Sequence, residues 1–271
     1  MQFLLTFPLV ETKEINSVVV VGAGNLATSL ALAMYHKGIK VLQVMNRTKG
    51  RGEKLAKRVS AKFTDDFRKA DFSADLFILA VSDSAISGLA GCLGLTRQLL
   101  VHTSGSTGIS CLEGRSENYG VLYPLQTFSV SRPSGFSGVP LCIESNSREG
   151  EEKLLSLGRR MGGNVHLITS AQRKVLHMTA VFASNFSNFM YAIAEDLLLK
   201  HDIPFSLLRP LILQTARNSR HEDIFKRQTG PAIREDGIVM DEQMEMLSKD
   251  EDYREIYELI SKSIIKYKQT R

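Results

Sequence analysis

Over roughly the first 168 residues, hydrophobic positions fall in short continuous runs separated by stretches of helical periodicity. Continuous apolar runs of this length are typical of strands buried on both faces of a parallel sheet. Four runs rich in Val, Leu and Ile occupy residues 17–21, 41–45, 75–81 and 99–102. Further strand signals lie at residues 61–63, 121–123, 139–143 and 165–168. Charged helical patterns lie between some of them, at residues 50–58 and 149–161. Strands that alternate with helices predict a doubly wound α/β fold.

The pattern changes at about residue 169. Strand signals end, and helical periodicity is predicted over residues 171–200, 204–218 and 241–268, with a break near 248–250. The segment 227–237, which contains Gly230-Pro231, is expected to be a loop. We therefore predict two domains: a doubly wound α/β domain over residues 1–168 and an all-helical domain over residues 169–271.

The first apolar run ends in a glycine-rich turn that opens a helical stretch. It reads Gly22-Ala23-Gly24-Asn25-Leu26-Ala27. Gly22 permits a sharp turn, Gly24 lets the backbone approach a phosphate, and Ala27 keeps the helix close to the strand. The free N–H groups of the helix N-terminus attract an anion. This pattern predicts dinucleotide binding at residues 22–26, and the alternative is a turn whose glycines serve packing alone.

The end of the second run predicts which dinucleotide binds. NAD-binding units usually carry Asp or Glu about 20 residues after the glycines, where it binds the ribose 2′-OH. This chain has Asn46-Arg47-Thr48 instead. Arg47 offers a planar fork that matches a phosphate, and Thr48 adds a hydroxyl. We therefore predict NADP(H), with Asn46, Arg47 and Thr48 at the 2′-phosphate. A solvated basic loop is the alternative.

Composition narrows the class of protein. The chain has 271 residues, 43% hydrophobic and 23% charged, with a formal net charge of +5. Because its basic residues are spread among acidic neighbours, we expect no nucleic-acid partner. The three cysteines lack pairing or metal-ligand spacing, so we expect no metal site and reduced thiols. The apolar N-terminal stretch 3–10 is too short to span a bilayer and lacks a cleavage motif, so we expect no membrane association and a cytoplasmic location.

Polar loops follow consecutive strands where the carboxyl edge of the sheet is expected. Val81 ends the run at residues 75–81, and Ser82 and Asp83 follow it, at the expected place of the nicotinamide. The loop after residue 102 contains Ser104 and Gly105 and is rich in small hydroxyl residues. The loop after residue 123 contains Gln126 and Thr127. We take Gly105, Gln126 and Thr127 as substrate-binding candidates; ordinary surface loops are the alternative.

A polar stripe is predicted on the first helix of the second domain. At 100° per residue, its members fall within one third of a turn: His177, Val181, Ser184, Asn185 and Asn188. An imidazole can donate a proton near neutral pH, and an amide can orient the group being reduced. We therefore take His177, Asn185 and Ser104 as catalytic candidates, and Ser184 and Asn188 as substrate-binding candidates. The alternative is a satisfied interhelical hydrogen-bond network.

These motifs together carry a resemblance to a known family. The turn at residues 22–27 followed by Asn46-Arg47-Thr48 looks like pyrroline-5-carboxylate reductases and deazaflavin-dependent NADP oxidoreductases. Residues 102–108, 123–128, 177–188 and 228–234 resemble Rossmann-like oxidoreductases whose C-terminal half is domain of unknown function 2520. The resemblance extends from about Ser17 to Leu259. It implies an NADP-binding Rossmann domain and a helical domain similar to that of 6-phosphogluconate dehydrogenase, which commonly dimerises.

Three positions depart from the relatives. Tyr123 stands where they often carry His, and Gln243 near where they tend to have another. Related hydroxyacid dehydrogenases place a catalytic Lys four residues before the helical Asn, where this chain has Val181. We still expect an NADP(H)-dependent reductase that acts on a carbonyl or imine of a small polar substrate, as a homodimer. The alternative is a non-catalytic NADP-binding sensor or scaffold.

Overall fold

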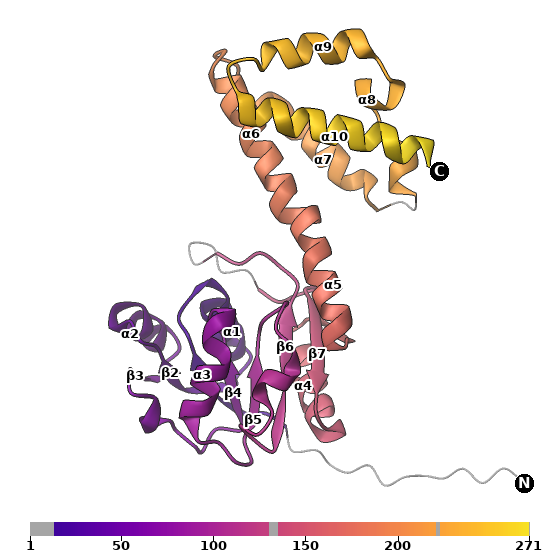
Figure 1. Cartoon of the computed structure of the whole chain (residues 1–271). Coiled ribbons are helices and arrows are strands. Elements are labelled where there is room, and N and C mark those ends of the chain that lie inside the picture. The colour runs from indigo at the N-terminus through magenta and orange to yellow at the C-terminus, as the bar shows by residue number, and fades with distance from the viewer. Residues whose placement is uncertain (1–13, 130–134, 221–222, 271) are drawn as a thin grey trace, which may run out of the picture. The chain divides into compact units, whose positions relative to one another are not determined.

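The computed structural model describes residues 14–129, 135–220 and 223–270 (Figure 1). The chain divides into two compact units, one ending at Ala183 and the other beginning at Ser184. We call them the sheet unit and the helical unit. An α/β unit followed by a helical unit confirms the predicted fold class. The helix after residue 169 belongs to the sheet unit in this division, and the predicted domain boundary at residue 168 stays a prediction.

The sheet unit is built on eight strands in the order β3-β2-β1-β4-β5-β6-β7-β8. They are β1 Ser17–Val21, β2 Lys40–Met45, β3 Lys62–Thr64, β4 Leu76–Leu79, β5 Leu99–His102, β6 Asn118–Pro124, β7 Pro140–Ser145 and β8 Asn164–Leu167. All neighbouring pairs are parallel except β6 and β7, which are antiparallel. Between these two strands the sequence predicts no helix, and antiparallel neighbours need no helical crossover.

Helices cover both faces of this sheet, as the alternation of side chains along β1 shows. Val18 and Val20 pack in one core cluster with residues of α1, α2 and α4, whereas Val19 and Val21 pack in another with residues of α3. All four valines are fully buried. The helices are α1 Asn25–His36, α2 Lys49–Arg58, α3 Asp83–Leu93, α4 Arg148–Arg160 and α5 Ser170–Ala180. Continuous burial explains why the strand sequence is apolar throughout rather than alternating.

The strand order reverses at β1: β2 and β3 are added on one side of it, and β4 and β5 on the other. The loops that follow β1 and β4 therefore lie side by side. Gly22, with φ of +118°, follows β1, and a Cβ there would lie 2.2 Å from the carbonyl oxygen of Ala80 after β4. Only glycine tolerates both the backbone conformation and this approach. In doubly wound sheets, ligands bind at such a switch point, beyond the carboxyl ends of the strands.

The helical unit consists of α6 Ser187–Leu199, α7 Arg209–Asn218, α8 Pro231–Arg234, α9 Gly237–Met246 and α10 Glu251–Gln269. The predicted break near 248–250 is confirmed, because it separates α9 from α10. The prediction of a loop over 227–237 was wrong in part. Pro231 starts the short helix α8, in line with the preference of proline for the first helical turn. Among the described residues, no helix is both long and apolar enough to cross a membrane.

Between α5 and α6 the helix changes type. Val181–Phe186 is π-helical, so its hydrogen bonds run to the fifth rather than the fourth residue. The predicted polar stripe assumes 100° per residue, an assumption that fails across this segment. The angular alignment of His177 with Asn185 and Asn188 therefore does not follow from their spacing. Single π turns within α-helices occur frequently at functional sites.

Candidate functional site

The glycine turn is shaped to receive an anion. Gly24 caps α1, and the first helical hydrogen bond runs from Thr28 N–H to the Gly24 carbonyl oxygen over 2.9 Å. A Cβ on Gly24 would have no heavy atom within 4 Å, so the backbone here borders open space. The N–H groups of the first helical turn have no intrahelical partner and point towards this space. The first turn of α1 carries no acidic side chain that would repel a phosphate.

A cleft of about 840 Å³ adjoins this turn and is basic on one side. The turn and α1 contribute Ala23, Gly24, Asn25 and Thr28; α2 contributes Arg51, Lys54, Leu55, Lys57 and Arg58. None of these four cations forms an ion pair with a described residue, so their charge is available to a ligand. The α2 residues were not predicted as ligands from the sequence, although the run of basic residues after Thr48 was a usable signal.

The predicted 2′-phosphate residues lie at the carboxyl end of β2. The Asn46 side chain donates to the Thr48 carbonyl oxygen over 2.7 Å, which shapes the turn into α2. Arg47 and Thr48 are exposed. Lys49 lies 3.6 Å from Asp65 on the surface. The loop therefore presents Arg47 to solvent as a cation, and its role at the phosphate stays a prediction.

The loops after β4 and β5 are joined by a hydrogen bond. The Ser106 hydroxyl donates to a carboxylate oxygen of Asp83, the first residue of α3. Val81 is half-buried, whereas Ser82 and Asp83 are exposed at the end of β4. Both loops lie at the carboxyl edge of the sheet beside the switch point. The bond fixes their spacing at the predicted place of the nicotinamide.

Ser104 holds the β5 loop together through its hydroxyl. Its Oγ accepts hydrogen bonds from Ser106 N–H at 3.1 Å and Thr107 N–H at 2.9 Å, and donates to Thr107 Oγ1 at 3.0 Å. The side chain is buried. These contacts favour a positioning role for Ser104 over direct attack on a substrate.

A buried ion pair, which was not predicted from the sequence, anchors this loop to α5. Arg173 is fully buried and forms a salt bridge with Glu144 of β7. Its guanidinium also donates to the carbonyl oxygens of Ser104 at 3.2 Å and Thr107 at 2.7 Å. Burial tends to raise the pKa of Glu144, but hydrogen bonds from Arg173 and Ser170 outweigh it and hold that pKa below its ordinary value. An arginine on a predicted helix gives no sequence sign that it is buried.

His102, at the end of β5, is fully buried and neutral. Its Nδ1 accepts a hydrogen bond from Ser104 N–H over 3.1 Å. Burial, reinforced by the nearby charge of Arg173, lowers the pKa of His102 to about 4. His102 therefore supports the β5 loop as an uncharged hydrogen-bond acceptor.

The predicted catalytic residue His177 meets Tyr123 and Gly105. The Tyr123 hydroxyl lies 3.0 Å from His177 Nδ1, and the two rings meet edge to face with centroids 5.9 Å apart. A Cβ on Gly105 would lie 2.6 Å from His177 Nδ1 and 2.9 Å from Tyr123 Cζ, so the pair needs glycine there. The structure thus brings together Gly105 of the β5 loop, Tyr123 of β6 and His177 of α5. Tyr123 was noted in the sequence only as a departure from relatives.

The other predicted substrate residues are not joined to this cluster by any described contact. Gln126 and Thr127 are exposed on the loop after β6, which the Asn25 side chain holds by donating to the Phe128 carbonyl oxygen over 3.0 Å. The helical candidates are all exposed and belong to the helical unit: Ser184, Asn185 and Asn188. Their roles stay predictions.

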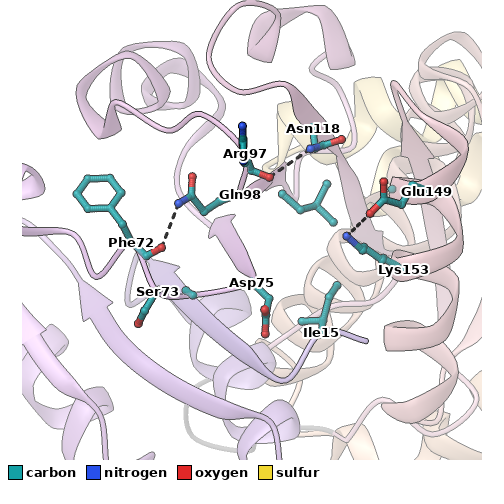
Figure 2. A pocket seen from close by; sticks show the side chains of 12 residues that line it. Ile15, Phe72, Ser73, Asp75, Arg97, Gln98, Asn118, Glu149 and Lys153 are labelled. Carbon is teal, nitrogen blue, oxygen red and sulfur yellow. Dashed lines mark hydrogen bonds and ion pairs between the residues drawn. The ribbon is translucent and has the colours of Figure 1, made fainter. Parts of the chain in front are cut away.

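A second cavity lies at the opposite edge of the sheet, and its chemistry argues against a functional site. It measures about 280 Å³ and borders the amino ends of β4 and β5 (Figure 2). Its polar groups already have partners: Lys153 pairs with Glu149, Asn118 donates to the Arg97 carbonyl oxygen, and Gln98 donates to the Phe72 carbonyl oxygen. Ligands of doubly wound sheets bind at the other edge.

Comparisons with known proteins agree with this geometry. Residues 139–264 match the model of domain of unknown function 2520, and residues 8–87 match that of shikimate/quinate 5-dehydrogenase. A crystal structure of a proposed NADP oxidoreductase from Bacteroides fragilis is 40% identical with a TM-score of 0.87, covering 93% of this chain and 98% of that one. No curated protein matches the sequence.

Two more distant structures share the fold. Pyrroline-5-carboxylate reductase from Streptococcus pyogenes has a TM-score of 0.60 at 13% identity, covering 92% of this chain and 98% of that one. An imine reductase from Myxococcus stipitatus in complex with NADP⁺ has a TM-score of 0.61 at 17% identity, covering 94% and 93%. The glycine turn, the switch-point geometry and the close Bacteroides relative agree: the chain belongs to the family of Rossmann-type oxidoreductases that carry domain of unknown function 2520.

Proposed function

We propose that this protein is an NADP(H)-dependent oxidoreductase that reduces a carbonyl or imine of a small polar substrate. The observation that carries the proposal is the open glycine turn beside a cleft lined by four cations that form no ion pair with a described residue. Open backbone at Gly24 accommodates a pyrophosphate, and the basic face of α2 suits a dinucleotide with an additional phosphate. The proposed NADP oxidoreductase of Bacteroides fragilis, 40% identical, supports the same cofactor.

The residues of the sheet unit have distinct proposed roles. Gly22, Ala23, Gly24, Asn25 and Leu26 hold the pyrophosphate; Asn46, Arg47 and Thr48, together with Arg51, hold the 2′-phosphate; Val81, Ser82 and Asp83 border the nicotinamide. When bound, the reduced cofactor supplies the hydride. The protein supplies orientation and a proton, for which His177 of α5 is the proposed donor. Ser104 shapes the loop that carries Gly105.

We place the remaining substrate contacts on Gln126 and Thr127 of the sheet unit and on Ser184, Asn185 and Asn188 of the helical unit. Asn185 is proposed to orient the group being reduced. In domain terms, residues 1–168 bind the cofactor and residues 169–271 bind substrate and assemble the dimer. Support for the helical part of this proposal is the π-helical segment, which includes Ser184 and Asn185.

A homodimer is part of the proposal. Large apolar side chains stay exposed on the helical unit, among them Leu207 at 67%, Leu211 at 62% and Leu259 at 68% exposure. Soluble monomers rarely expose apolar surface in such density, and a symmetric interface through these helices would cover it.

Turnover measurements test the proposal. NADPH oxidation is followed against panels of 2-oxo acids, β-keto acids and cyclic imines. With an active substrate, we expect His177→Gln to lower turnover by about 10²–10⁴-fold, the usual contribution of a general acid, at unchanged NADPH affinity. NADPH binding without turnover on any panel member would favour the sensor alternative. If His177→Gln leaves turnover intact, His177 is not the proton donor.

A further inference from the structure

Tyr123 is buried, and its hydroxyl has a restricted choice of partners. The side chain of Tyr123 is 9% exposed, and within the described part of the chain its hydroxyl forms one hydrogen bond, to His177 Nδ1 at 3.0 Å. Buried hydroxyl hydrogens are costly to leave unpaired. Nδ1 is the acceptor in reach of this hydrogen, and the direction of the bond depends on which nitrogen of His177 carries hydrogen.

This bond sets the protonation of His177. A neutral imidazole carries its hydrogen on one nitrogen, and the hydrogen bond at the other nitrogen decides which one. If Nδ1 accepts from Tyr123, the hydrogen of His177 is on Nε2. Nε2 makes no hydrogen bond to a described residue, and the histidine is half-buried. The ring therefore offers a free Nε2–H donor while its other nitrogen is held by a phenol.

We propose that Tyr123 and His177 form a proton relay, in which Nε2 of His177 protonates the substrate and Tyr123 replaces the proton through Nδ1, and that the substrate is a carbonyl compound. The proposal rests on the proposed function, because it needs hydride transfer to the substrate. Tyr123 is a positioning residue and proton reservoir that acts through His177.

The proton balance selects the substrate class. When a hydride adds to a carbonyl carbon, the electron pair of the C=O π bond passes to oxygen, which then takes the Nε2 proton of His177. The Tyr123 proton moves to Nδ1 and leaves a phenolate. When solvent then protonates Nε2, Nδ1 returns its hydrogen to the phenolate, so each turnover takes up one proton from solvent and both groups regain their starting state. Reduction of an imine also consumes one proton, but an imine is basic enough to take that proton from solvent before the hydride arrives, whereas a carbonyl must receive it from an acid in the site. A relay that delivers one proton therefore suits a carbonyl.

The basicity of the groups permits this transfer. Burial raises the pKa of Tyr123 above its ordinary value, so the phenol is neutral and keeps its hydrogen at neutral pH. An alkoxide is about as basic as hydroxide, and its conjugate acid has a pKa far above that of a phenol. The product alkoxide is thus a stronger base than the phenolate, and the proton moves towards the product.

The arrangement is also fixed in space. Gly105 packs against both rings, and Arg173, one helical turn before His177, attaches α5 to the loop that carries Gly105. The Tyr123–His177 distance therefore depends on two independent contacts with the β5 loop. A side chain at position 105 would force the rings apart.

Nuclear magnetic resonance tests the tautomer without substrate or cofactor. Long-range ¹H–¹⁵N spectra at about pH 8 report which nitrogen of His177 carries hydrogen, with His177→Gln used to assign its signals among the six histidines. We expect hydrogen on Nε2 and an Nδ1 signal that shifts in Tyr123→Phe and Gly105→Ala. The control Tyr119→Phe, on the same strand, should change neither. Hydrogen on Nδ1, or an Nδ1 signal unaffected by Tyr123→Phe, would overturn the relay.

Kinetics then test the relay in action. We expect Tyr123→Phe to lower carbonyl reduction by about 10- to 100-fold, part of the general-acid contribution. The double variant with His177→Gln should be no slower than His177→Gln alone, because Tyr123 acts through the histidine. Additive losses, or reduction of imines but of no carbonyl, would overturn the proposal. Absence of any turnover would instead contradict the proposed function, and the tautomer measurement would stand on its own.

Discussion

The sheet unit and the helical unit differ in how far their apolar side chains are buried. In the sheet unit, Val18–Val21 of β1 and Leu76–Leu79 of β4 are fully buried between two layers of helices. In the helical unit, the apolar side chains classed as buried in the described segments are Ala232 and Leu247 alone, and Leu259 is 68% exposed. The difference shows that the sheet unit buries its core within one chain, and it is the reason for proposing a second copy over the helical unit.

Removing the buried salt bridge between Arg173 and Glu144 should have the largest effect on the stability of the sheet unit. Arg173→Met leaves Glu144 charged and partly buried without its partner, so we expect a loss of about 3–5 kcal/mol in the free energy of unfolding. Arg148→Met is the matched control, because its pair with Glu152 is on the surface, with the arginine side chain 91% exposed. There we expect at most about 1 kcal/mol. Denaturant titration measures both, and equal losses would contradict the anchor role.

A pair of leucines compares the two units directly. Leu79→Ala in β4 removes a fully buried side chain and should cost about 2–5 kcal/mol. Leu259→Ala in α10 should change monomer stability by less than about 0.5 kcal/mol, because most of its surface is already in contact with water. Similar losses at low protein concentration would show that the helical unit has a core of its own.

The acid sensitivity of the sheet unit follows from His102. Its pKa is about 4 in the folded protein, against an ordinary value of 6.5, so the unfolded chain binds a proton more readily between these values. Stability should therefore be complete above pH 6.5 and fall by up to about 3 kcal/mol as the pH drops to 4. Glu144, whose pKa is lowered, adds a further loss below its ordinary range. Melting curves of His102→Gln should show a flatter pH slope, whereas the exposed His166→Gln should keep the full slope.

Sequence reasoning succeeded where a local pattern decides the outcome. The strand at 99–102, the glycine turn and the break between α9 and α10 all follow from short runs of residues. It failed where tertiary contacts decide. Nothing near Arg173 shows that its charge is buried against Glu144, and the polar stripe assumed a regular helix where the structure has a π segment. The contact between Tyr123 and His177 could not be predicted, because the two residues are far apart in the sequence and meet only where β6 lies against α5.

A substitution on the exposed face of the helical unit should barely change monomer stability but should change the mass of the protein in solution. If the exposed face of the helical unit is covered by a second copy, light scattering at micromolar concentration should give twice the 30.1 kDa of one chain. Leu259→Asp should shift the protein towards a monomer, since it places a charge in the interface. A monomeric mass for the unaltered chain would contradict the comparison between the units.

The binding of two dinucleotides tests the central claim most directly. Calorimetric titration should show NADPH binding about 10- to 100-fold more tightly than NADH, the equivalent of about 1.5–3 kcal/mol for one charge-assisted phosphate contact. Arg47→Ala should remove this preference, and Gly24→Val should abolish binding of both while the protein stays folded, because its side chain would occupy the space open at the turn. Equal affinities for the two cofactors, equally lowered by Arg47→Ala, would contradict the account.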